Sequence, residues 1–251
     1  MCGICLSHPK PLQAEFYCRS CLTPFVDSYP LDEHDLCTVC RESAVNFDAV
    51  YSFGSYEGTL RELIHLFKYA KVETLAQPLG RMLAEVAPRG EAFDLVVAMP
   101  MHWRKRWSRG FNQAELLAEK TAGRYGLKLS SCLRRRRATK AQAGLSEADR
   151  ANNLKDSFRV HKPAQVRGKR ILLIDDVFTT GATLRAATAA LKSAGASRVV
   201  GLTLARVDRS PFGPSNASTS RFSLRRLSTS LASSEECAGN EKETPVEVGE
   251  L

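Results

Sequence analysis

The sequence predicts an α/β protein in which a parallel, twisted sheet is flanked by helices and preceded by a small cysteine-rich module. Apolar runs at 95–99, 171–174 and 199–204 have the composition of strands that are buried on both faces of a parallel sheet. Stretches of helical periodicity follow the first two of these runs. Such alternation implies right-handed crossovers, which place helices on both faces of the sheet.

Residues 1–46 form the predicted cysteine-rich module. It contains three Cys-x2-Cys pairs: Cys2 and Cys5, Cys18 and Cys21, and Cys37 and Cys40. In a cytosolic chain, pairs at this spacing are typical of tetrahedral zinc sites rather than disulfides. Four of the six cysteines would therefore hold one structural zinc ion. The second and third pairs match the interval of a zinc ribbon, and the first pair with the second is a nearly equal alternative.

Two further interpretations of this module stay open. His8 or His34 would complete a second metal site, although an exposed loop histidine is the favoured interpretation of each. Without a metal, the cysteines would be free buried thiols or a redox pair. The zinc interpretation is preferred because a module this short buries too little apolar surface to fold without the ion.

Residues 47–208 form the predicted α/β domain, which begins with short alternating elements. A strand is expected at 50–53 and an amphipathic helix at 60–69, because Leu60, Leu63, Ile64 and Phe67 fall on one face of that helix. Further helices are expected near 75–87 and 113–125, on either side of the strand at 95–99.

A basic loop follows the strand at 95–99 and leads into the string Arg109-Gly110-Phe111-Asn112-Gln113. Its four basic residues are Arg104, Lys105, Arg106 and Arg109. At the carboxyl end of a strand, these groups are well placed to bind a diphosphate and to neutralise charge on a departing group. The alternatives are a solvated basic loop and a nucleic-acid strip in which Trp103 and Trp107 stack on bases.

The segment 171–183 carries the most informative pattern in the chain. Two adjacent carboxylates, Asp175 and Asp176 (the acid pair), follow four aliphatic residues at the carboxyl end of a strand, where open α/β sheets bind ligands. Residues 179–183 (the Thr/Gly loop) then lead into a helix, and exposed N–H groups at such a position form an anion site. Gly181 allows close approach of the backbone or a positive φ. The pattern suits a sugar phosphate such as ribose 5-phosphate; the alternative is a buried strand with a solvated acid pair.

This segment resembles the phosphoribosyl diphosphate (PRPP) binding motif of the type I phosphoribosyltransferases. The resemblance implies that the acid pair holds the ribose hydroxyls, directly or through Mg²⁺. Phe178 departs from the motif, which usually has a smaller aliphatic residue at this position. The remaining PRPP-binding residues that the resemblance implies, most of them around the 5-phosphate, are Val177, Thr179, Thr180, Gly181, Ala182 and Thr183.

The chain as a whole resembles the ComF family (ComFC/GntX-like), phosphoribosyltransferase-like proteins associated with DNA uptake in naturally competent bacteria. The resemblance covers most of residues 1–206 and includes the cysteine pairs and the segment 56–69. Its most specific part is the string RGFNQ at 109–113. Many family members carry four cysteine pairs and some carry two, so the three pairs here leave the zinc ligands open. Residues that stand in the family's order further along are Gln142, Arg150, Asn153 and Phe158.

The resemblance implies a type I phosphoribosyltransferase fold with an N-terminal zinc-ribbon-like module, and Mg²⁺ and zinc as cofactors. As an enzyme, the protein would transfer a phosphoribosyl group to an unidentified acceptor, with the acid pair and Arg109 as catalytic residues. Arg104, Arg106 and Arg109 would bind the diphosphate. The alternative is a PRPP-responsive protein that binds single-stranded DNA without transfer. A competence helicase or other DNA-uptake proteins are possible partners.

Two segments near the end of the chain are polar. Residues 133–158 are expected to be solvated surface or, by resemblance to the superfamily, a segment that closes over bound substrate. Residues 209–251 are expected to be a disordered tail. Eleven of the twenty-five residues at 210–234 are Ser or Thr, and this composition buries too little apolar area to offset the ordering entropy.

Charge and hydropathy limit the remaining classes. Residues 210–251 contribute −2 to the net charge of +9, so residues 1–209 carry +11. A basic folded part favours an anionic partner, although a solubilising surface explains the excess equally well. No apolar run approaches the roughly 20 residues that cross a bilayer. Because the chain enters a cysteine motif at once, no signal peptide is expected, and a cytoplasmic protein is predicted.

Overall fold

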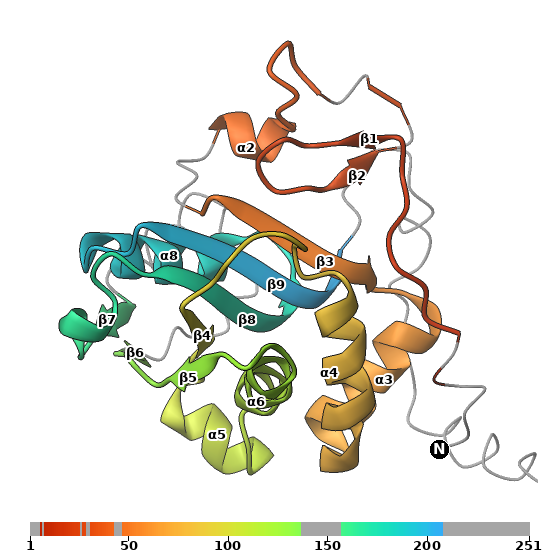
Figure 1. Ribbon diagram of the computed structural model, residues 1–251. Helices are drawn as coiled ribbons and strands as arrows, with labels where there is room; N and C mark the ends of the chain where they lie inside the picture. The colour runs from red at the N-terminus through yellow and green to blue at the C-terminus, as the bar shows by residue number, and fades with distance from the viewer. Residues whose placement is uncertain are drawn as a thin grey trace, which may run out of the picture. The chain divides into compact units, whose positions relative to one another are not determined.

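The computed structural model (Figure 1) describes residue 6 and residues 8–25, 27–28, 31–42, 47–136 and 157–207. These residues belong to one compact unit. Several positions singled out in the sequence lie outside the described part: Cys2, Cys5, Gln142, Arg150, Asn153, the middle of the segment 133–158 and the predicted tail, as do the side chains of Arg104 and Lys105.

A five-stranded parallel sheet forms the centre of the fold and confirms the predicted α/β class. Its strand order is β3–β9–β8–β4–β5. Strand β8 lies in the middle, with Leu172 paired to Val96 on one side and to Val200 on the other. The strands are β3 (Ala49–Ser55), β4 (Leu95–Ala98), β5 (Lys128–Ser130), β8 (Arg170–Phe178) and β9 (Arg198–Arg206).

Helices cover both faces of this sheet, as the strand–helix alternation predicted. Helices α3 (Gly58–Tyr69), α4 (Ala76–Glu85) and α6 (Gln113–Tyr125) lie together on one face (Figure 1). Helix α8 (Ala182–Ser193) packs on the other face, whose core also contains Phe25 of the cysteine-rich module. The module therefore shares a hydrophobic core with the sheet.

Shorter elements complete the described part. Helix α5 (Trp103–Arg109) stands where a basic loop was predicted: the chain turns helical at Trp103, and the N–H of Arg106 donates to the carbonyl of His102 at 3.0 Å. The others are β1 (Phe16–Tyr17), β2 (Pro24–Phe25), α2 (Thr38–Glu42), η1 (Glu73–Leu75), β6 (Leu133–Arg135), β7 (Phe158–Val160) and η2 (Pro163–Gln165). Strands β6 and β7 pair antiparallel and form the base of the segment 133–158.

Strand β8 is longer than predicted and changes its side-chain pattern at the acid pair. It continues to Phe178 because β9 pairs with it up to Arg206. Before the acid pair, Leu173 faces α8 and Leu172 faces α3, α4 and α6. After it, Val177 packs with the cluster of Leu172 and Phe178 with that of Leu173. The acid pair therefore stands where the alternation of side chains along β8 changes phase.

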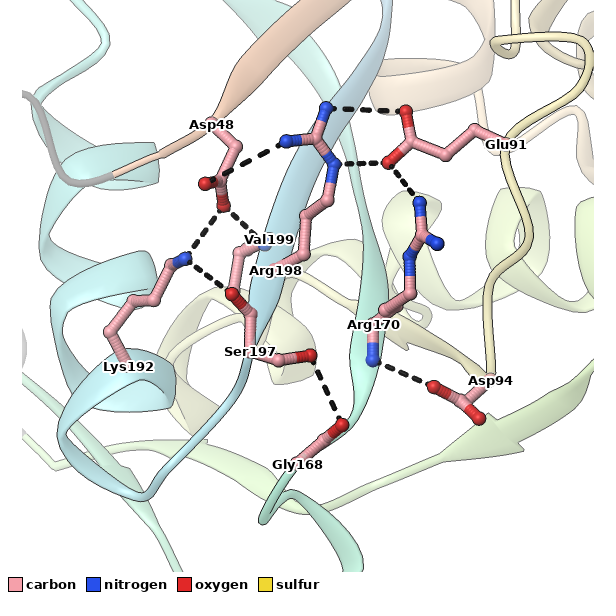
Figure 2. Close-up of polar contacts among 9 residues, drawn as sticks. All are labelled: Asp48, Glu91, Asp94, Gly168, Arg170, Lys192, Ser197, Arg198 and Val199. Atoms are coloured by element: carbon pink, nitrogen blue, oxygen red, sulfur yellow. Dashed lines mark hydrogen bonds and ion pairs between the residues drawn. The ribbon is translucent and has the colours of Figure 1, made fainter.

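An ion-pair network joins the amino-terminal ends of the strands (Figure 2). Asp48 accepts a hydrogen bond from the N–H of Val199 at 2.7 Å and pairs with Lys192 at 2.8 Å. Glu91 contacts two guanidinium groups, that of Arg198 and that of Arg170, the latter at 3.0 Å. This end of the sheet lies opposite the acid pair, so the network stabilises the sheet away from the candidate site.

We expect Glu91→Gln to lower the free energy of unfolding by about 1–2 kcal/mol, because it weakens both arginine contacts at a partly solvated position. Burial alone would raise the pKa of Glu91, but hydrogen bonds from Arg198 and Arg170 outweigh burial and hold this pKa below its usual value. In the unfolded chain the pKa of this carboxyl is about 4.3. The stabilisation is therefore complete above that pH and is lost as the pH falls through the folded-state pKa.

Thermal melting of the wild type and of Glu91→Gln between pH 3 and pH 8 measures how the stabilisation by Glu91 depends on pH. The difference in stability between wild type and Glu91→Gln should shrink toward zero at the acidic end. The exposed Glu62 on α3 provides the control: Glu62→Gln should leave the melting temperature unchanged at every pH. A difference that persists undiminished below the folded-state pKa would contradict the ionic origin of the stabilisation.

Candidate functional site

The acid pair lies near the carboxyl end of β8, and a cation contacts Asp176. The N–H of Asp176 donates to Oδ1 of Asp175 at 2.9 Å. Lys68 Nζ lies 2.9 Å from Oδ1 of Asp176, and both side chains are largely buried, at 11% and 17% exposed. Lys68 belongs to the last turn of α3, so this ion pair connects the central strand to the helical layer. Arg135 of β6 interacts electrostatically with Asp175.

Asp175 is the carboxyl group whose protonation the site shifts most clearly. Burial, followed by the charge of Asp176, raises the pKa of Asp175 to about 7, although the N–H of Asp176, Lys68 and Arg135 all act in the opposite direction. Near neutral pH this carboxyl is therefore present in both its protonated and its ionised form. A cation bound at the acid pair would favour the doubly ionised form, because an opposite charge stabilises the carboxylate.

We expect Lys68→Met to weaken binding of the anionic PRPP with Mg²⁺ by about tenfold at pH 7, because loss of the ammonium removes a cation that attracts the phosphate groups. It also raises the pKa of Asp175 further and leaves more of it protonated. The affinity should recover in part as the pH rises. Titration calorimetry of PRPP with Mg²⁺ between pH 6 and pH 9 measures this dependence. Lys71→Met changes an exposed lysine three residues further on and should follow the wild-type profile; identical profiles for both variants would contradict this role of Lys68.

The Thr/Gly loop has the backbone conformation that its sequence predicted for Gly181. Gly181 has a φ of +72°, and a Cβ atom there would lie 2.9 Å from the ring of Phe178. Helix α8 begins directly after it, at Ala182, so the N–H groups of the first helical turn belong to this loop. The N–H of Ala182 donates to Oγ1 of Thr180 at 3.4 Å. The Nη1 atom of Arg185 lies 3.2 Å from the same Cβ position, which adds a cation beside the loop. The loop therefore combines N–H donors and positive charge.

The basic residues around α5 divide between two locations. The guanidinium group of Arg109 lies 5.2 Å from the centre of the Tyr69 ring and donates to Oε1 of Gln113 at 3.4 Å. Because Tyr69 directly follows Lys68, Arg109 and the acid pair both contact the end of α3. Arg106 instead pairs with Glu115 of α6 at 2.9 Å, where both side chains are about half exposed. The asparagine of the RGFNQ string, Asn112, caps α6 by accepting from the N–H of Ala114.

Four cysteines of the module come together as a candidate metal centre. Their sulfur atoms all lie within 4.8 Å of one another, and all four residues are buried: Cys18, Cys21, Cys37 and Cys40. The Sγ atoms of Cys21 and Cys37 are 3.7 Å apart, close to the separation of about 3.8 Å that Zn–S bonds of about 2.3 Å give in a tetrahedron. A soft, four-sulfur donor set at this spacing fits zinc. Among the described residues, the structure thus assembles the second and third cysteine pairs.

Sequence reasoning missed three cations at this site: Lys68, Arg135 and Arg185. Lys68 stands inside the segment 56–69 that carried part of the family resemblance, and it directly follows the buried Phe67, but no local pattern links it to the acid pair. Arg135 belongs to a polar segment that was interpreted as a surface or a lid. Arg185 falls on the helix after the Thr/Gly loop. Lys68 and Arg135 reach the site only through the folding of distant segments, whereas Arg185 is local to the loop.

The fold and the site define a phosphoribosyltransferase-like protein, and residues 112–223 match the Phosphoribosyl transferase domain family. The DNA utilization protein YhgH of Salmonella typhi is 33% identical over 170 residues, which cover 65% of this chain and 74% of that protein. Competence protein F of Haemophilus influenzae is 29% identical over 212 residues, covering 81% and 90%. This chain belongs to the ComF family.

Among solved structures, the chain is similar to the adenine phosphoribosyltransferase of Thermoanaerobacter pseudethanolicus. It is 23% identical, covers 54% of this chain and 83% of its own, and has a TM-score of 0.35. Within the described residues, none of the helices combines the length and the apolar composition that a membrane span requires.

Proposed function

We propose that this protein binds PRPP or ribose 5-phosphate with Mg²⁺ and transfers the phosphoribosyl group to an acceptor with release of diphosphate. The observation that carries the proposal is the succession of acid pair and Thr/Gly loop at the carboxyl end of the central strand. Carboxylates suit the hydroxyls of ribose, and the N–H groups at the start of α8 suit its 5-phosphate. The match to the Phosphoribosyl transferase domain supports this assignment.

The residues of the acid pair fit Mg²⁺, because carboxylate oxygens are the protein ligands that this ion prefers. When bound, Mg²⁺ would supply neutralising charge to the diphosphate. The acid pair would hold the ribose hydroxyls, and the PRPP-binding residues of the Thr/Gly loop would enclose the 5-phosphate.

In the transfer step, the acceptor forms a bond to the anomeric carbon, and the bond from that carbon to the diphosphate oxygen breaks with its electrons leaving on diphosphate. Positive charge develops on the ribose ring, where the acid pair stabilises it. Negative charge develops on the diphosphate, where Arg109, whose guanidinium group lies over the Tyr69 ring at the end of α3, would compensate it. Lys68 would assist only after leaving Asp176. Of the remaining basic residues, Arg106 would assist only after leaving Glu115.

We place this activity in DNA uptake on the cytoplasmic side, with a competence helicase or other uptake proteins as partners. The names of the relatives, DNA utilization protein and Competence protein F, support this setting. A second function, binding of single-stranded DNA without transfer, is favoured by the tryptophans of α5, since Trp107 is 82% and Trp103 59% exposed beside basic residues. Exposed aromatic rings next to cations are suitable platforms for bases.

Diphosphate release distinguishes the two functions. Purified protein is incubated with PRPP, Mg²⁺ and candidate bases or oligonucleotides. Transfer predicts release that depends on an acceptor and is lost in Asp175→Asn, whereas Asp35→Asn, at an exposed position in the cysteine-rich module, keeps it. Binding of oligonucleotides that persists in Asp175→Asn, is lost in Trp107→Ala and never accompanies turnover would instead support the second function and exclude the first.

A further inference from the structure

Phe178, the residue that departs from the PRPP motif, supports the Thr/Gly loop from within the core. It is the last residue of β8 and is 5% exposed. A Cβ at Gly181 would lie 2.9 Å from its ring, so the ring fills the space beneath the loop. On another side the ring meets Phe47 edge-on, with centroids 6.3 Å apart. The conformation of the loop therefore depends on where this ring is held.

Arg206 holds the Phe178 ring and connects it to the cysteine-rich module. It ends β9 directly opposite Phe178 in the ladder, and it is 1% exposed. Its guanidinium carbon lies 5.0 Å from the centre of the Phe178 ring, and its Nη2 donates to the carbonyl of Cys21 at 2.7 Å. A buried guanidinium is costly unless its N–H groups are hydrogen-bonded, so the position of that carbonyl matters for the position of Arg206.

Cys21 contacts Arg206 and is also part of the four-cysteine cluster. Its carbonyl accepts from Arg206, and its sulfur is one of the four that fit zinc. The backbone around Cys21 is fixed most firmly when its sulfur is bound, because a metal ligand loses freedom in both its side chain and its main chain. A continuous series of contacts therefore runs from the four-cysteine cluster through Arg206 and Phe178 to Gly181.

We propose that Arg206 and Phe178 are positioning residues that couple zinc binding at the four-cysteine cluster to ligand binding at the Thr/Gly loop. The inference rests on the proposed function, since it concerns the same phosphate site. With the cluster loaded, the Cys21 carbonyl holds Arg206 against the Phe178 ring, and the ring holds Gly181 at positive φ. Coupling between two sites is reciprocal, so PRPP must tighten zinc binding by the same factor by which zinc tightens PRPP binding.

The test measures zinc affinity of the full chain by competition with a chromophoric chelator, with and without saturating PRPP and Mg²⁺, and again with ribose 5-phosphate. In wild type the ligand should lower the Kd for zinc by about tenfold, a typical coupling factor. In Phe178→Leu, which restores the smaller aliphatic residue of the motif, and in Arg206→Met, the shift should fall below twofold. The ligand itself also chelates zinc and changes the apparent Kd. Because this effect is the same for every variant at one ligand concentration, it does not affect the comparison between variants.

A control separates coupling from general destabilisation. Val199 is a fully buried residue of β9 in the same core as Phe178, at the other end of the strand. Val199→Ala should lower stability and keep the full ligand-dependent shift. If ligand binds normally but shifts the Kd for zinc equally in wild type and Phe178→Leu, or in neither, the coupling is wrong while the proposed function stands. If wild type binds neither PRPP nor ribose 5-phosphate, both fail.

Discussion

Replacing Gly181 by valine is expected to weaken PRPP binding by about 100-fold or more. Gly181 has a φ of +72°, which a β-branched residue adopts only under strain of about 1–3 kcal/mol. The new Cβ would also lie 2.9 Å from the Phe178 ring, so the loop must move. Because the proposed phosphate site consists of the N–H groups of this loop, their displacement removes several hydrogen bonds at once. Calorimetric titration with PRPP and Mg²⁺ measures the loss.

The matched control for this change is Gly123→Val. Gly123 lies on the exposed side of α6, and no atom stands within 4 Å of the position that its Cβ would occupy. This variant introduces the same side chain into open space and should bind PRPP with wild-type affinity. If Gly181→Val also kept that affinity while remaining folded, the 5-phosphate would have to bind elsewhere.

Replacing Cys37 by serine is expected to abolish stoichiometric zinc binding and to lower the melting temperature by about 10 °C or more. Serine is a poor zinc ligand, and loss of a structural metal removes several kcal/mol of folding free energy. At about 2–4 °C per kcal/mol for a chain of this size, that loss is large. The module also shares a hydrophobic core with the sheet, so its unfolding should expose part of the face that α8 covers. Zinc content by atomic absorption and a thermal melt measure both effects.

Cys132 supplies the comparison for the cysteine variants. It is as buried as the clustered cysteines but is not one of the four. Cys132→Ser should keep one zinc per chain and lose only the stability that a buried thiol contributes. Equal loss of zinc in both variants, or full zinc content in Cys37→Ser, would show that the four-cysteine cluster is not the metal site.

The sheet could be predicted because its determinants are local. Four consecutive aliphatic residues identify a strand buried on both faces, and β8 has this environment. The zinc pairs were visible for the same reason, although the interval alone left two pairings open, and the structure assembles the one between residues 18 and 40. Strand β5, only three residues long, left no such pattern, because most of it is exposed.

Only those residues of the candidate site that lie in one continuous segment could be predicted from the sequence. The acid pair lies in β8 and Gly181 three residues after its end, so the sequence placed them together. The contact of Lys68 with Asp176 and that of Arg206 with Cys21 join segments that are far apart in the chain. Neither periodicity nor spacing records such contacts, because they depend on how α3 and the module pack on the sheet. The helix α5 was not predicted for a related reason: the composition of residues 103–109 indicated charge, but not whether the chain would be helical there.

The ammonium of Lys68 contacts Asp176, and the charge of Arg135 acts on Asp175, so these four side chains together carry no net charge when all are ionised. A polyanionic sugar that diffuses toward two bare carboxylates would be repelled at short range. Here the charges of Lys68 and Arg135 offset that repulsion before the ligand binds. Binding of such a molecule should consequently depend on the other basic residues around the site, and its association rate should fall as added salt screens them.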